Sequence, residues 1–88
     1  MHYEFDPVKD DSNFKKHGMS LSDAEGFDWE TAFILEDRRQ AYAEARFEAK
    51  GYVGDRLCVV VFCLRASAVR IISLRKANLR EVKSYAKA

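Results

Sequence analysis

Basic side chains gather near the end of the chain, and two of them are adjacent. Residues 65–88 contain one acid, Glu81, and seven basic residues: Arg65, Arg70, Arg75, Lys76, Arg80, Lys83 and Lys87. A guanidinium beside an ammonium group can hold one phosphate, because both donate charge-assisted hydrogen bonds to its oxygens. We therefore expect Arg75 and Lys76 to bind a phosphate together. Four others are candidates for neighbouring phosphates: Arg65, Arg70, Arg80 and Lys83.

Cleaving a phosphodiester without a metal also requires proton transfer. A base must draw a proton from the attacking hydroxyl, and an acid must protonate the leaving oxygen. The candidates for these roles are His17, Glu48, Glu81 and Tyr85. Histidine suits either role because it titrates near neutral pH, whereas a lysine would serve only if nearby positive charge lowered its pKa.

Each candidate also has a purely structural interpretation. The adjacent cations can be a solvated pair at the end of a strand. His17 precedes a glycine that closes a helix, where a cation complements the helix dipole. Glu81 can cap a helix, Glu48 can pair with a basic neighbour across a sheet, and Tyr85 can pack in a core. The residue types alone leave both interpretations open.

The basic residues lie where a strand is expected to end and a helix to begin. Residues 69–74 alternate as a strand does, which would place Val69, Ile71 and Ser73 on one face. Asn78 with Glu81 three residues later then predicts a capped helix. The phosphate-binding candidates would therefore lie at a joint between two rigid elements.

The remaining patterns predict a small α+β fold. Asp6-Pro7 begins a helix that Gly18 closes, and Ser20 opens a second, short helix. The predicted strands are residues 2–5, 29–36, 46–53, 57–64 and 69–74, with the 29–36 segment the weaker of them. The last three should form an antiparallel meander, because their connections are too short for parallel crossovers. We expect a small antiparallel sheet of three to four strands, N-terminal helices and a C-terminal helix.

Composition limits the class of protein. A chain of 88 residues with 48% hydrophobic residues predicts one domain over residues 1–88. The net charge is only +1, yet residues 1–37 hold ten acids against three bases, so charge reverses along the chain. No membrane-spanning run or secretory signal is visible, which predicts a cytoplasmic protein. Cys58 and Cys63 should lie on opposite faces of one strand, too far apart to form a disulfide, and no zinc site is expected.

Several motifs together resemble one protein family. They are Phe5-Asp6-Pro7-Val8-Lys9, Asn13, Lys16-His17-Gly18, Ala45-Arg46-Phe47, Val59-Val60-Val61 and the run from Arg70 to Asn78. In this order and spacing, over nearly the whole chain, they are similar to the BrnT toxins of bacterial toxin-antitoxin pairs. Two positions depart from that pattern, since Phe5 stands where the family often has Trp, and Ala66 where it usually has Gly.

The resemblance implies a RelE-like fold and a metal-independent ribonuclease that cuts RNA and slows translation, with no cofactor. It also implies neutralisation by a small BrnA-type antitoxin in a hetero-oligomer, with operator DNA bound only through that antitoxin. On this view the catalytic candidates are Arg75, Lys76, His17, Glu48 and Tyr85. The RNA-binding candidates are Arg65, Arg70, Arg80 and Lys83.

Two other classes of function fit the same residues. In one, the cations only neutralise phosphates and the chain is a nucleic-acid-binding module without cleavage. In the other, the acidic front half receives a basic segment of a partner and the chain has no affinity for RNA. RNA cleavage in the presence of EDTA separates the ribonuclease from both.

Overall fold

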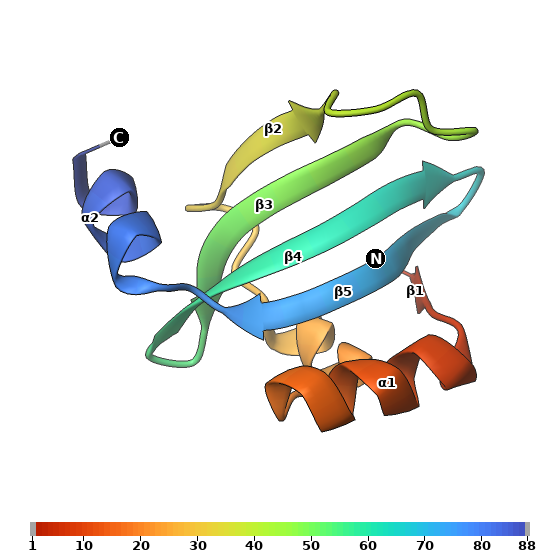
Figure 1. Ribbon diagram of the computed structural model, residues 1–88, viewed down its shortest axis with the longest axis horizontal. Coiled ribbons are helices and arrows are strands. Elements are labelled where there is room, and N and C mark those ends of the chain that lie inside the picture. The colour runs from red at the N-terminus through yellow and green to blue at the C-terminus, as the bar shows by residue number, and fades with distance from the viewer. Residues whose placement is uncertain (1, 88) are drawn as a thin grey trace.

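The computed structural model describes residues 2–87, in which two α-helices and a 3-10 helix surround a mixed five-stranded sheet (Figure 1). The elements in chain order are β1 (Tyr3–Glu4), α1 (Pro7–His17), η1 (Leu21–Gly26), β2 (Phe33–Asp37), β3 (Arg46–Val53), β4 (Arg56–Arg65), β5 (Ala68–Lys76) and α2 (Leu79–Lys87). This order confirms the predicted α+β class, with helices at both ends of the chain.

The sheet has the strand order β1-β5-β4-β3-β2. Strands β3, β4 and β5 form the predicted antiparallel meander, and β2 extends it by pairing antiparallel with β3. At the other edge β1 pairs parallel with β5. The expectation of three to four antiparallel strands was therefore wrong in number and direction. Parallel pairing is possible here because most of the chain separates β1 from β5.

A β-bulge divides β5 into two halves. Val61 of β4 pairs with Ser73 whereas its neighbour Phe62 pairs with Ile71, so Ile72 is an extra residue on β5. An inserted residue turns every later side chain to the other face.

The bulge changes which residues of β5 share a face. Leu74 points to the same side as Ile71, and Ser73 points to the same side as Arg70 and Arg75. The expected common face of Ile71 and Ser73 was therefore wrong. The same shift places Arg70 and Arg75 on one face of the sheet, although residues an odd number apart on a regular strand point to opposite faces.

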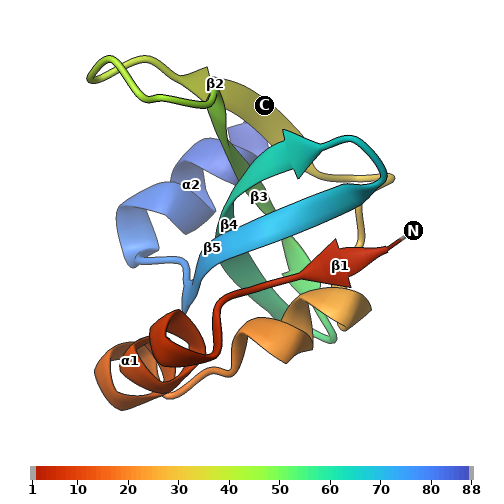
Figure 2. The same cartoon turned by 90° about the vertical axis from the view of Figure 1, so that its right-hand side faces the viewer.

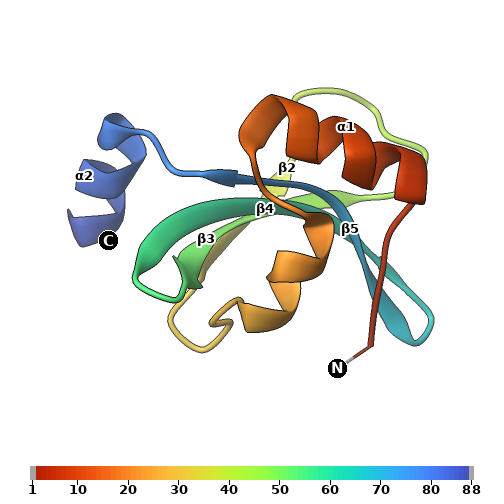
Figure 3. The ribbon, with the colours of Figure 1, turned by 90° about the horizontal axis from the view of Figure 1, so that it is seen from below.

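One side of the sheet, which we call the covered face, carries the core. Helix η1 lies beneath it, while α1 runs along the β5 edge (Figures 2 and 3). The buried core residues are Leu21, Ala24, Phe27, Ala49, Cys58, Val60, Phe62, Val69, Ile71 and Leu74. Trp29 packs edge-on against Phe27 and Phe62, with ring centroids 4.6 and 5.1 Å away. Removing this apolar area from water is the main force that holds the helices to the sheet.

Helix α1 begins and ends where the sequence predicts. The Asp6 side chain accepts a hydrogen bond from the Val8 N–H at 2.8 Å, and Pro7 occupies the first turn. Gly18 adopts a left-handed conformation with φ 72°, and its N–H donates to the Phe14 carbonyl at 2.7 Å.

A buried asparagine fixes α1 against the sheet. The Asn13 side chain is 6% exposed and bonds both backbone groups of Leu74, donating to its carbonyl at 2.8 Å and accepting from its N–H at 3.1 Å. It also donates to the Met19 carbonyl at 2.9 Å. Asn13 thus provides hydrogen-bond partners for the backbone of β5 beyond the end of the two-residue strand β1.

Helix α2 stands on the opposite side of the sheet from η1 (Figure 2). Asn78 and Glu81 form the predicted reciprocal cap, each side chain accepting from the other's N–H at 2.8 and 2.9 Å. None of the nine residues of α2 is buried. Tyr85 attaches the helix by packing against a small cluster of Leu57, Val59 and Ala77.

Both cysteines are buried, and they are free of a disulfide, as predicted. Cys58 lies in the core of the covered face, and the register places Cys63 on the other face of β4. Burial raises the pKa of the Cys58 thiol, which keeps it protonated and unreactive.

Candidate active site

The side of the sheet opposite the core, which we call the open face, carries the charged residues. Strand pairing aligns them in rows, because residues paired across a sheet point to the same side. Lys50, Val59 and Arg75 form one row, and Glu48, Val61 and Ser73 form the next. Cys63 and Arg70 form a third row near the tip of the β4–β5 hairpin. The open face therefore presents charge along the same strands that bury apolar residues on the covered face.

Arg75 forms the best-defined contact on this face. Its guanidinium makes two parallel hydrogen bonds to the Glu81 carboxylate, at 2.7 and 2.8 Å. The side chains are 33% and 15% exposed. These bonds hold the pKa of Glu81 at about 2 and raise the pKa of Arg75. The guanidinium is therefore fixed in direction and permanently charged at the joint between β5 and α2.

A second ion pair lies beside Arg75. Lys50 and Glu48 are 3.1 Å apart on β3, with side chains that are 19% and 28% exposed. The charge of Glu48 helps to raise the pKa of Arg75, and the charge of Lys50 helps to lower the pKa of Glu81. Glu48, Lys50, Arg75 and Glu81 thus form an alternating group of charges, which we call the Arg75 cluster.

His17 approaches the cluster from the end of α1. It lines a shallow hollow of about 230 Å³ at the β5 edge, together with Lys16 and Ser73. The pKa of the imidazole lies below its ordinary value, first because of partial burial and then because of the positive charges of Lys16 and Arg75. A neutral imidazole can accept a proton, so His17 fits the role of a base near neutral pH.

The structure separates Lys76 from Arg75. Val59 of the open face pairs with Arg75, whereas Cys58 of the covered face pairs with Lys76, so the two cations point to opposite sides. The expectation that they hold one phosphate together was therefore wrong. Consecutive strand residues alternate in direction, and the bulge lies before both of them.

Of the candidates on α2, Glu81 bonds Arg75, and Tyr85 packs beside the charged row against Val59. The Tyr85 hydroxyl donates to the Thr31 carbonyl at 2.6 Å, and its ring packs edge-on against Tyr52, which favours a packing role. Lys83 is exposed and lies on the far side of α2 from Tyr85 by helical spacing. Arg80 is also exposed on α2, and neither basic residue forms an ion pair within residues 2–87.

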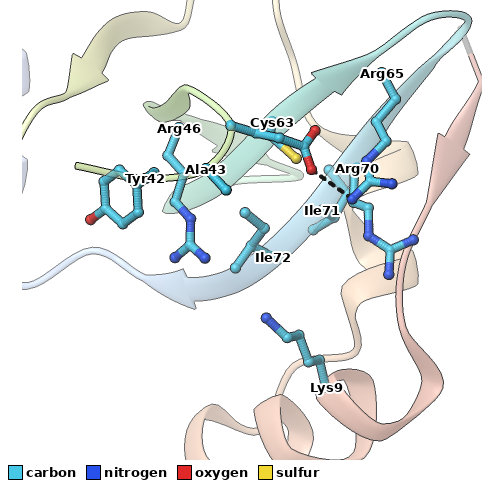
Figure 4. A pocket seen from close by; sticks show the side chains of 10 residues that line it. Lys9, Tyr42, Ala43, Arg46, Cys63, Arg65, Arg70, Ile71 and Ile72 are labelled. Atoms are coloured by element: carbon cyan, nitrogen blue, oxygen red, sulfur yellow. Dashed lines mark hydrogen bonds and ion pairs between the residues drawn. The ribbon is translucent and has the colours of Figure 1, made fainter. Parts of the chain in front are cut away.

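The predicted Arg65 and Arg70 lie together at the other end of the open face. They line a pocket of about 220 Å³, which we call the Arg70 pocket (Figure 4). Two further cations reach into it that were not among the predicted site residues, Lys9 from α1 and Arg46 from β3. The site is therefore larger than predicted and draws on both halves of the chain.

Sequence reasoning also missed Lys50. The signal was available, because Lys50 follows Glu48 by two residues on a predicted strand and must share its face. No such signal existed for Lys9, whose position depends on how α1 lies against β5.

This arrangement has the groups for metal-free chemistry on a phosphodiester. Arg75 can stabilise negative charge on a phosphate, while His17 and Glu48 can exchange protons beside it. Within residues 2–87, no cluster of three His, Cys, Asp or Glu residues could hold a metal ion.

Comparison with known proteins decides the family. A model described as the ribonuclease toxin BrnT of a type II toxin-antitoxin system matches residues 5–81, which is most of the chain. The chain belongs to the BrnT family of ribonuclease toxins. The BrnT match covers the Arg75 cluster, His17 and the Arg70 pocket, and it ends at Glu81, the carboxylate that binds Arg75. No curated protein matches the chain.

Membership of the BrnT family has a consequence for partners. A type II toxin-antitoxin system pairs its toxin with a protein antitoxin, so this BrnT chain has a protein partner. In the part of the chain that the structure describes, no helix has the length and apolar character needed to cross a membrane.

Proposed function

We propose that this BrnT chain is a metal-independent endoribonuclease whose reaction takes place at the Arg75 cluster. The observation that supports the proposal is the fixed guanidinium of Arg75 on the open side of the sheet, whose charge lowers the pKa of His17. A cation aimed at a developing phosphorane is the largest contribution that such a site can make.

The proposed reaction is an internal transfer within the RNA strand. The 2′-oxygen attacks the adjacent phosphorus while His17 takes its proton, with Glu48 as the second candidate base. Arg75 stabilises the charge on the non-bridging oxygens. The bond from phosphorus to the 5′-oxygen breaks, and that oxygen takes a proton, for which the Lys50 ammonium group in the same row is available. The products are a 2′,3′-cyclic phosphate and a 5′-hydroxyl.

The biological role follows the family. We infer that RNA cleavage in the cytoplasm inhibits translation and that a BrnA-type antitoxin neutralises the chain in a hetero-oligomer that binds operator DNA through the antitoxin. Support for a protein partner comes from edge strand β2, where Phe33, Ile34 and Leu35 are 44%, 46% and 54% exposed. The open sheet with helices on its flanks supports a RelE-like fold in a single domain.

The test is incubation of the antitoxin-free protein with RNA in excess EDTA. The wild type should yield fragments with 2′,3′-cyclic phosphate ends, and Arg75→Ala should reduce the rate at least about 100-fold. Circular dichroism melts should show that the variant remains folded. Intact RNA under every condition would contradict the proposal.

The same assay separates the other two classes of function. Salt-dependent RNA binding without any product would indicate a nucleic-acid-binding module. The absence of RNA affinity after removal of the antitoxin would indicate a protein-binding role alone.

A further inference from the structure

The Arg70 pocket lies apart from the Arg75 cluster on the same open face. Arg70 and Arg75 are five residues apart on β5, which corresponds to at most roughly 16 Å of strand. The pocket is lined by four cations and one carboxylate: Lys9, Arg46, Arg65, Arg70 and Glu44. A group bound to Arg75 therefore leaves the pocket free for another part of the same ligand.

Two of the four cations have no carboxylate partner within residues 2–87. Neither Lys9 nor Arg46 forms an ion pair there. Lys9 extends from α1 and Arg46 extends from β3, and the two approach Ile72 from opposite sides of the pocket (Figure 4). Their charges are thus directed into the pocket and available to an anion.

The other two cations are only partly neutralised. Arg65 bonds Glu44 at 2.8 Å and approaches Glu4 at 3.9 Å, while Arg70 approaches the same Glu4 at 3.7 Å. The Arg65 and Glu44 side chains are 46% and 48% exposed, so solvent weakens their pairing. Four cations face two carboxylates, which leaves the pocket with a net positive charge.

An aromatic ring flanks these cations. The Arg46 guanidinium carbon lies 4.5 Å from the centre of the Tyr42 ring. The Tyr42 hydroxyl donates to Asp37 at 2.9 Å, and Asp37 is held in turn by Arg39 at 2.8 Å. The ring and guanidinium are therefore orientated before any ligand arrives and offer flat surfaces on which a nucleobase can stack.

We propose that the Arg70 pocket is a second subsite for single-stranded RNA, separate from the site of cleavage. It binds one phosphodiester through Lys9, Arg46 and Arg70, and it stacks the adjoining base on the Arg46–Tyr42 pair. This inference rests on the proposed ribonuclease function and extends it, because one strand would then bridge the pocket and the Arg75 cluster. An acidic peptide would use the charges but leave the stacking surface empty.

The test measures binding of a fluorescent 2′-O-methyl RNA of about twelve nucleotides, which lacks the free 2′-hydroxyl needed for cleavage. The double variant Lys9→Ala/Arg46→Ala removes the two unpaired cations. Its matched control is Lys15→Ala/Arg38→Ala, which removes two charges from α1 and from the loop after β2, outside the pocket. Fluorescence anisotropy is recorded over a series of salt concentrations with the antitoxin absent.

We expect the pocket variant to weaken binding about 10-fold or more, with a salt slope reduced by about 0.7 for each phosphate that is no longer neutralised. The control should change affinity less than about 2-fold, because its cations do not touch the strand. Equal weakening in both double variants, or no weakening in either, would overturn the subsite. If the double variant does not fold, Lys9→Gln and Arg46→Gln are measured singly against Lys15→Gln and Arg38→Gln.

Tyr42→Leu tests the stacking part of the inference. It should lower affinity by about 5-fold or more while leaving the salt slope unchanged, because no charge is removed. Unchanged affinity would overturn the assignment of a base to this ring. If the pocket variant binds RNA normally but loses affinity for the purified antitoxin, the pocket is a protein site and the inference fails.

The cleavage proposal can fail without the subsite failing. A wild type that cuts no RNA but binds the 2′-O-methyl strand through Lys9 and Arg46 would contradict the reaction and support the pocket. Cleavage that is insensitive to both pocket variants at limiting RNA would support the reaction and contradict the pocket.

Discussion

The two faces of one sheet serve different purposes in this protein. On the covered face, Val60 and Leu74 are completely buried beneath the helical layer. On the open face of the same strands, Arg75 and Lys50 are partly exposed, and α2 covers only one end of the sheet, where Tyr85 packs against Val59. Most of the apolar burial and most of the charge thus fall on alternate residues of the same strands.

The two faces of the sheet differ most clearly at the consecutive residues Arg75 and Lys76. Arg75→Ala should reduce RNA cleavage by about 100-fold to 1,000-fold, because it removes the charge that faces the open side. Lys76→Ala should reduce it by less than about 3-fold, because the ammonium group points to the covered side. Initial rates on one RNA, measured for both variants, check this prediction. A larger loss for Lys76→Ala would show that the face assignment does not govern catalysis.

The contact that fixes α1 to the edge of β5 should affect stability rather than activity. Asn13→Ala removes the side chain that bonds both backbone groups of Leu74, and it should lower the free energy of unfolding by about 2–4 kcal/mol. Urea denaturation measures the change. Ser12→Ala, at the exposed neighbouring position, is the control and should cost less than about 0.5 kcal/mol. A similar loss for both variants would argue against a special role for Asn13.

A smaller effect is expected at Gly51, where the core leaves no room for a side chain. An added Cβ would lie 2.6 Å from the Phe27 ring and 3.2 Å from Ala32. Gly51→Ala should therefore destabilise the fold by about 1–3 kcal/mol. Gly26→Ala is the matched control, since its Cβ would meet only Val53 at an ordinary 3.8 Å. Thermal melts of the two variants should differ, and equal melts would contradict the packing.

On the open face, the charge of Glu81 should make a modest contribution to stability. Its pKa is about 2 in the folded protein, below the ordinary value of 4.5, so its contribution is complete above about pH 4.5 and is lost as pH falls toward 2. Glu81→Gln should cost about 1 kcal/mol at pH 7 and much less near pH 2. Denaturation curves at both pH values measure this. An equal cost at both would show that the charge of Glu81 is not responsible.

Local signals predicted the helix caps correctly, whereas the last strand, expected over residues 69–74, runs from Ala68 to Lys76. The caps at Asp6, Gly18 and Asn78 could be read because each depends on residues within one turn. Arg75, expected after the strand, lies within β5 near its end and bonds Glu81 of α2.

Long-range pairing could not be read in the same way. The parallel strand β1 and the position of Lys9 depend on contacts between distant segments. The bulge at Ile72 was the most consequential feature that the sequence did not predict, because no residue type indicates it. It moves the side chains of all later residues of β5 to the opposite face of the sheet.

The two bonds from Glu81 to Arg75 mean that the protein already carries an anion where we propose that RNA is held. Binding would then be an exchange, in which a phosphate replaces an internal carboxylate that is always present at high local concentration. The Glu81 carboxylate would exclude anions that bind Arg75 weakly. Only a ligand that also binds elsewhere on the sheet would displace it.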